Sequence, residues 1–210
     1  LVHPVKAHPA VEKAVVLYNS TGAVDIDLGA VASTDAEPAT FTVDGSAVVS
    51  SSGTLKFNKT ETETNLTTKF TIIGGLNNDT LYGAAGADTI TTGAGVNTAG
   101  GNAGADTITG GSGIDTLAGD AGADSITGAG GADVITGGSG NDTISGGDGA
   151  DTITPGAGAD NVTGGAGIDT FIYSAATDSR GATADTITDF VSGSDNIRLT
   201  HTFPTTQNGT

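Results

Sequence analysis

The strongest constraint on this chain is a nine-residue period that runs from Asp79 to Asp169. Of the eleven positions spaced by this period, ten are Asp and one is Asn97. The residue two places earlier is Gly at every position after the first, and the residue two places later is apolar, weakly so only at Ala99. A disordered linker rich in Gly, Ala and Thr is the alternative, but compositional bias does not keep a strict period over this many units. The period predicts a repeat architecture.

The repeat is written GGxGxDxUx, in which U is aliphatic, and the stretch GGSGNDTISG at 137–146 matches it letter by letter. This pattern resembles the RTX (repeats in toxin) nonapeptide. The resemblance covers 74–172 and implies an all-β fold, a right-handed parallel β-roll (β-solenoid), in which GGxGxD forms a turn and xUx a short strand. Alternating apolar stretches predict a β-rich region over 1–73, either a partial β-sandwich or irregular β-structure. We expect a C-terminal β cap over 173–203, followed by a tail over 204–210.

The physical chemistry of the repeat agrees with this resemblance. Glycine permits the positive backbone angles of a tight turn, and the aliphatic side chain points inward while its strand neighbours point outward. Burial of one aliphatic side chain contributes roughly 1.5–3 kcal/mol, whereas ordering the backbone costs about 1–2 kcal/mol per residue. A nonapeptide with one apolar anchor therefore needs stacked strand hydrogen bonds and a metal ion as well.

Carboxylates and turn carbonyls are hard oxygen donors, which suit Ca²⁺ with its roughly six to eight ligands better than zinc or copper. Successive repeats should fall on opposite sides of the roll, so every second turn stacks, the aspartates form two columns, and an ion between stacked turns uses two of them. Counting such pairs predicts about seven to nine Ca²⁺ ions, and a metal-free chain that is largely unfolded. The expected ligands are the aspartates Asp79, Asp88, Asp106, Asp115, Asp124, Asp133, Asp142, Asp151, Asp160 and Asp169, and the turn glycines Gly86, Gly104, Gly113, Gly122, Gly131, Gly140, Gly149, Gly158 and Gly167.

One turn departs from the pattern in three further places. Around Asn97, Thr92 replaces the first Gly, Val96 precedes the Asn and Ala99 takes the aliphatic place. We expect a weak or empty calcium site there. Neutral drift and a selected distortion both fit this departure.

The period ends after Phe171, and the segment DTITDFVSGSDNIRL resembles the strand-rich segment that closes the roll in serralysin-type proteases and some bacterial surface-layer (S-layer) proteins. A repeat stack needs its last apolar layer covered, and the expected capping core is Ile187, Phe190, Ile197 and Leu199. Three nearby acids are candidates for a further calcium site, with a solvated acidic surface as the alternative: Asp185, Asp189 and Asp195.

Charge and missing motifs exclude several functions. The chain has 24 acidic and 7 basic residues and a formal net charge of −17, which disfavours nucleic acid and anionic membranes and favours cations. No apolar run reaches the roughly 20 residues that cross a bilayer, so no membrane insertion is expected. There is no Cys, HExxH or GxSxG motif, and the regular carboxylates are explained by calcium, so we expect no enzyme activity.

These features favour an extracellular calcium-binding structural protein. The low Lys content and the richness in Ala, Thr and Gly resemble S-layer members of the RTX group, which implies type I secretion, a bacterial surface location and self-association in an array. The alternatives are the secretion and folding tail of a hydrolase (a protease or lipase) and an adhesin.

A further alternative is an ice-binding β-solenoid, because the outward residues beside U form a hydroxyl ladder on one face. The simpler explanation of this ladder is that Thr is a favourable residue at solvent-facing strand positions. The opposite face is mixed and carries Tyr82, Val134 and Ile172, which makes it the better candidate for docking to a neighbouring chain.

Overall fold

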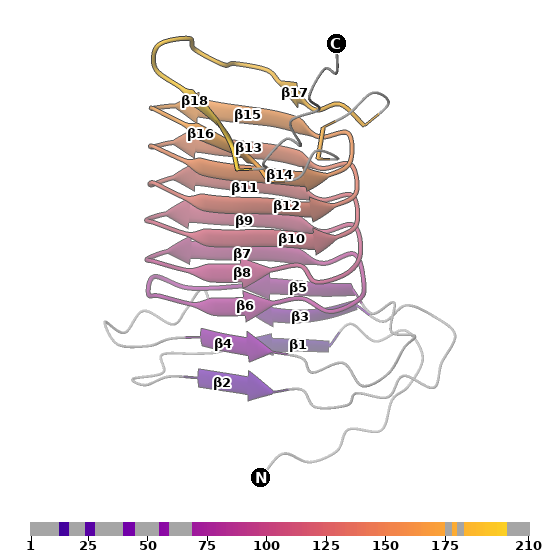
Figure 1. Ribbon diagram of the computed structural model, residues 1–210. Coiled ribbons are helices and arrows are strands. Elements are labelled where there is room, and N and C mark those ends of the chain that lie inside the picture. Colours follow the sequence, from indigo (N-terminus) through magenta and orange to yellow (C-terminus); the bar gives the residue numbers. More distant parts are fainter. Residues whose placement is uncertain are drawn as a thin grey trace, which may run out of the picture.

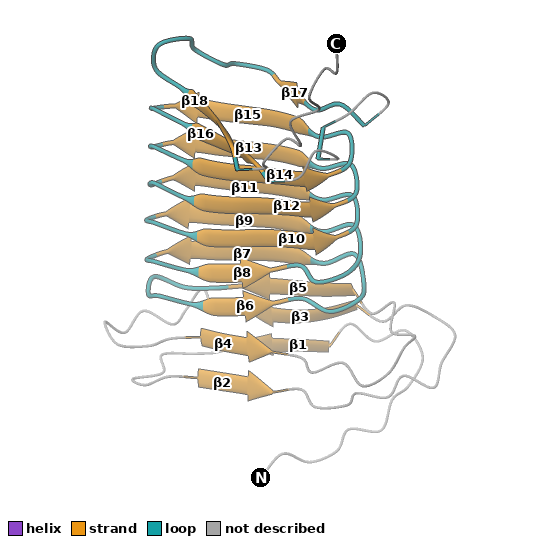
Figure 2. Cartoon of the chain, viewed as in Figure 1, coloured by secondary structure: helices purple, strands orange, loops and turns teal. Residues whose placement is uncertain are grey.

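The computed structural model describes residues 13–16, 24–27, 40–44, 55–58, 69–174, 178–179 and 183–200. All regular secondary structure in these residues is β-strand (Figure 2). The same part of the chain therefore contains no helix that could cross a bilayer.

Two parallel sheets run the length of the stack, and successive strands alternate between them (Figure 1). One sheet holds the odd-numbered strands β1 (Lys13–Val16), β3 (Thr40–Asp44), β5 (Lys69–Ile73), β7 (Thr89–Ala94), β9 (Thr107–Ser112), β11 (Ser125–Gly130), β13 (Thr143–Asp148), β15 (Asn161–Ala166) and β17 (Thr186–Ile187). The other holds β2 (Val24–Asp27), β4 (Leu55–Asn58), β6 (Thr80–Tyr82), β8 (Thr98–Gly100), β10 (Thr116–Ala121), β12 (Val134–Ser139), β14 (Thr152–Ala157), β16 (Thr170–Tyr173) and β18 (Asn196–Leu199). The predicted parallel β-roll is confirmed.

The register between strands follows the period of the sequence. Ile126 pairs with Ile108 on one side and with Ile144 on the other, so each repeat strand lies beside the strands two repeats before and two repeats after it. The aliphatic position of every repeat is buried, including the small Ala99. The core is a column of single side chains between two sheets. The core stays narrow because alternation in a strand turns only every second side chain inward.

The described strands before residue 59 continue the same two sheets. Lys13 pairs with Phe41, and Val24 pairs with Leu55. In both pairs the partners are further apart along the chain than two nonapeptide repeats. These strands therefore pair as the repeat strands do, but the chain that connects them is longer than in the repeats. A search for a fixed period cannot detect these coils, because their connections differ in length.

The C-terminal strands extend both sheets by one more strand. Asn161 pairs with Thr186 and Thr170 pairs with Asn196. Of the predicted capping residues, Ile187 packs partly buried against the core column, whereas Phe190 is 40% exposed although its ring lies 6.2 Å from that of Phe171.

The other two predicted capping residues are wrong, because Ile197 is 51% and Leu199 57% exposed. β18 is the edge strand of its sheet, and no described strand lies beyond it to cover its side chains.

Candidate metal centre

The repeat aspartates lie in two buried columns, one at each edge of the roll. From Asp106 to Asp169, each carboxylate accepts a hydrogen bond through Oδ1 from the main-chain N–H of the residue two repeats earlier, which is Asn97 for Asp115 and an aspartate for the others; Asp106 and Asp88, for example, are joined at 2.7 Å. The same bond links Asp124 to Asp106 and Asp142 to Asp124, both at 2.8 Å. The alternate turns bear their own ladder, in which Asp133 is bonded to Asp115 at 2.8 Å. The predicted stacking of carboxylates from every second turn therefore exists at atomic level.

The second oxygen of most of these carboxylates has no partner. Oδ2 is buried without a hydrogen bond in Asp106, Asp115, Asp124, Asp133, Asp142, Asp151, Asp160 and Asp169. A buried charged oxygen is costly unless it is paired. Such atoms require either a proton or a cation.

Burial raises the pKa of these carboxyl groups, and the Oδ1 hydrogen bonds lower it only in part. Desolvation raises the pKa of Asp106 to about 7, with added repulsion from Asp88 and Asp124. The pKa values of Asp142 and Asp151 rise to about 6, again chiefly through burial. Without a cation, the charged columns therefore destabilise the folded roll near neutral pH.

A space bounded by oxygen atoms lies beside Oδ2 of eight repeat aspartates. Six of them, from Asp106 to Asp151, have an unpartnered Oδ2, whereas Oδ2 of Asp79 and of Asp88 accepts the main-chain N–H of Gly75 and of Ala84. The space is left by the glycine five places before the aspartate, since a Cβ built there would lie under 3 Å from Oδ2 and from a carbonyl oxygen of the next coil. We call this space the cradle. The eight cradles that combine a glycine, a carboxylate and such a carbonyl belong to Gly74 with Asp79, Gly83 with Asp88, Gly101 with Asp106, Gly110 with Asp115, Gly119 with Asp124, Gly128 with Asp133, Gly137 with Asp142 and Gly146 with Asp151.

The glycines predicted as ligands, two places before each aspartate, form a second row of stacked carbonyls. A Cβ on Gly122 would collide with the carbonyl oxygen of Gly104, and Gly140 bears the same relation to Gly122. Gly122 has a φ of 146° and Gly140 one of 129°, values that favour glycine. Gly86 supplies the carbonyl under Gly104 at the start of this row.

The donor set is a mixture of single carboxylates and main-chain carbonyls. Within the described ranges no three His, Cys, Asp or Glu side chains gather into one metal-binding group. Hard oxygen donors of this kind fit Ca²⁺, which accepts carbonyl ligands readily.

Comparison with protein families decides the identity of this segment. The model described as the RTX calcium-binding nonapeptide repeat (4 copies) matches residues 71–99, 100–135 and 136–171. Residues 71–171 are RTX repeats. RTX repeats bind calcium, and the cradles lie within the matched residues. A comparison with curated proteins gave no match to this chain.

Two RTX turns carry a side chain in place of the cradle glycine. Thr92 occupies this place in the turn of Asn97, as the sequence shows, and both side chains are buried. Pro155 occupies it in the turn of Asp160, a departure that was not among those predicted from the sequence. The aspartate of this turn is present, so a search for the periodic acidic residues does not detect the change from Gly to Pro155.

The acids beyond the RTX repeats are bonded to the main chain. Asp185 accepts the N–H of Asp160 at 3.0 Å, so it takes the next place in one column, and its Oδ2 is buried without a partner. Asp195 accepts the N–H of Asp169 at 3.1 Å and continues the other column. Asp189 differs, because its two oxygens accept the amides of Gly164 and Gly165 at the end of β15.

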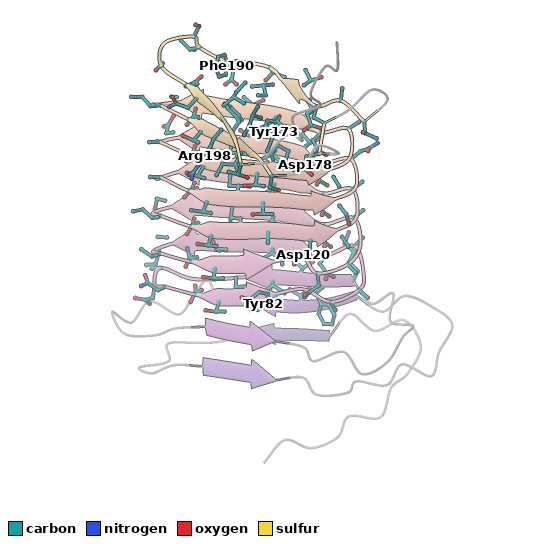
Figure 3. All side chains as sticks on the ribbon, viewed as in Figure 1. Tyr82, Asp120, Tyr173, Asp178, Phe190 and Arg198 are labelled. Atoms are coloured by element: carbon teal, nitrogen blue, oxygen red, sulfur yellow. The ribbon has the colours of Figure 1, made fainter. Side chains whose placement is uncertain are left out.

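Asp178 lies one further period after Asp169 and was not among the predicted site residues. Asp178 is buried, and its Oδ2 accepts the main-chain N–H of Ser174 at 2.8 Å. Asp79 accepts the N–H of Gly75 through the same spacing along the chain. Asp178 lies near Tyr173 at the C-terminal end of the stack (Figure 3). The period itself was the available signal, but the glycines that normally accompany it are absent.

Proposed function

We propose that this chain is a calcium-binding structural protein of the bacterial cell exterior, an S-layer component without enzyme activity, whose roll folds after export and then self-associates. The observation that carries the calcium part is the row of buried, unpartnered Oδ2 atoms from Asp106 to Asp151, each beside a cradle of oxygen atoms. Bound calcium supplies the positive charge and the ligand bonds that these oxygens lack. Eight divalent ions would offset nearly all of the formal net charge of −17.

Folding after export follows from the two environments. Where calcium is scarce, the acidic columns repel one another and the narrow core stabilises too little, so the chain stays unfolded and transportable. Outside the cell, millimolar calcium matches the roughly 10⁻⁴–10⁻³ M dissociation constants of extracellular calcium modules. The same ion would thus both permit export and drive folding.

Self-association is supported by aliphatic side chains at one rim of the roll. Leu76, Val96 and Ile114 lie in three successive turns of the same column, and each is more than half exposed. Ile168 adds a fourth exposed side chain further along the rim. Contiguous apolar surface of this kind is typical of interaction sites.

The test is assembly of the purified chain in calcium. Electron microscopy should show ordered sheets at millimolar Ca²⁺, and they should disappear in the variant Val96→Ser/Ile114→Ser. The matched control is Ala105→Ser/Ala123→Ser, at equivalent places in the other column. A chain that folds in calcium and remains monomeric would contradict the array and favour the tail of a hydrolase or an adhesin.

The hydroxyl ladder supports a second candidate function, ice binding. Thr91, Thr109, Thr127, Ser145 and Thr163 lie in register across five strands of one sheet. The calcium-loaded chain should then show thermal hysteresis that Thr127→Tyr removes and that Thr136→Tyr, in the other sheet, leaves intact. Absence of hysteresis in the unmodified chain would exclude this function.

A further inference from the structure

The turn of Asn97 closes on itself by a hydrogen bond between side chains. Asn97 Oδ1 accepts the main-chain N–H of Asp79 at 2.8 Å, as the aspartates of the other turns do. The amide nitrogen Nδ2 consequently takes the place of the unpaired Oδ2. It donates to Thr92 Oγ1 at 3.3 Å and reaches the Gly95 carbonyl at 3.5 Å.

The Thr92 side chain takes the place of a cradle. In the neighbouring turn of this column, the corresponding residue is Gly110, and a Cβ there would lie 2.7 Å from Asp115 Oδ2. Thr92 has a Cβ at this place and is fully buried. Its hydroxyl oxygen accepts the Asn97 amide, so the turn contains neither the space nor the negative charge of the others.

Both substitutions are needed for this arrangement, as the turn of Asp160 shows. Pro155 also replaces the glycine there, but Asp160 keeps its carboxylate, and Oδ2 is buried without a partner. A side chain at the glycine place therefore does not by itself satisfy the acid. An amide nitrogen is a donor and cannot serve as a ligand for a cation.

We propose that the hydrogen bond from Asn97 to Thr92 replaces a calcium ion, so that this turn is a calcium-independent link within a calcium-dependent roll. The inference rests on the proposed calcium binding of the other turns. The turn keeps its contacts to both neighbouring coils, because Asn97 N–H also donates to Asp115 Oδ1 at 2.8 Å. The neutral amide moreover interrupts the repulsion along its acidic column.

The first experiment restores the RTX pattern with Thr92→Gly/Asn97→Asp. Native mass spectrometry at saturating calcium should count one more ion in this variant than in the unmodified chain. Equal, non-zero counts would overturn the inference while leaving calcium binding intact. No bound calcium in either protein would instead refute the proposed function.

The second experiment transplants the pair into the neighbouring turn with Gly110→Thr/Asp115→Asn. This variant should bind one ion fewer and keep its β-structure in calcium, as measured by circular dichroism. Loss of the fold, or an unchanged ion count, would overturn the inference. Should the first variant not fold in calcium, the transplant decides alone.

Discussion

Asp106 Oδ1 accepts the main-chain N–H of Asp88 at 2.7 Å, while Oδ2 of the same carboxylate is buried without a partner. One oxygen thus joins two coils, and the other faces a cradle. The same division holds for the six aspartates from Asp106 to Asp151, so each of them both positions the turn and leaves an oxygen for a cation. Structure and calcium binding depend on the same side chains, and the first predictions concern this dependence.

Replacing one column aspartate should remove one ion. In Asp124→Asn the amide can still accept the Asp106 N–H, but its nitrogen faces the cradle and repels calcium. We expect one ion fewer by native mass spectrometry and a several-fold higher calcium concentration at the folding midpoint. Asp148→Asn makes the same charge change at an exposed position and should alter neither value. Equal effects of the two variants would show that only net charge matters.

Filling a cradle should have a similar effect without any change in charge. In Gly128→Ala the new methyl group would collide with Asp133 Oδ2 and the Gly146 carbonyl oxygen. Gly130→Ala is the control, because its nearest contact would be the Gly111 carbonyl oxygen at 3.7 Å. Calcium titration followed by circular dichroism should show weaker binding for Gly128→Ala alone. Unchanged binding in that variant would contradict the cradle as the cation site.

Protons should partly replace calcium in the metal-free roll. Burial raises the pKa of Asp106 from 3.8 to about 7, so the folded state binds protons more tightly than the unfolded chain. The resulting stabilisation is complete below about pH 4 and is lost as the pH rises through about 7. In chelator, β-structure measured by circular dichroism should therefore increase on acidification from pH 8 to 4. A decrease in β-structure on acidification would contradict the raised pKa of the buried aspartates.

The core column should be sensitive to single truncations. Ile126 is buried between Ile108 and Ile144, and Ile126→Ala should lower the free energy of unfolding in calcium by about 2–5 kcal/mol. Ile114 is 54% exposed, and Ile114→Ala should change it by less than about 0.5 kcal/mol. Denaturant titrations at fixed calcium would measure both. Comparable losses of unfolding free energy in the two variants would mean that the buried column of aliphatic side chains is not the main source of core stability.

At the C-terminal end of the stack, the nine-residue period no longer predicts which acids continue the two aspartate columns. Asp185 and Asp195 occupy the next places in the two columns, yet they follow Asp160 and Asp169 at intervals longer than two repeats and unequal to each other. Hydrogen bonds between coils require only that the two turns meet in space. The chain between them can therefore lengthen without loss of the bond, and no fixed spacing identifies it.

Along residues 79–171 the sequence by itself determined the coil length, the inward side chains and the aspartate columns, because a short-range repeat requires every unit to adopt the same turn and strand. Only the tertiary structure decided which carboxylate oxygens from Asp106 to Asp169 have no partner, that Asn97 is paired with Thr92, and that the strands before residue 59 continue the roll. These outcomes depend on contacts between coils, where the distance along the chain varies and the direction of a side-chain atom is set by its neighbours in space.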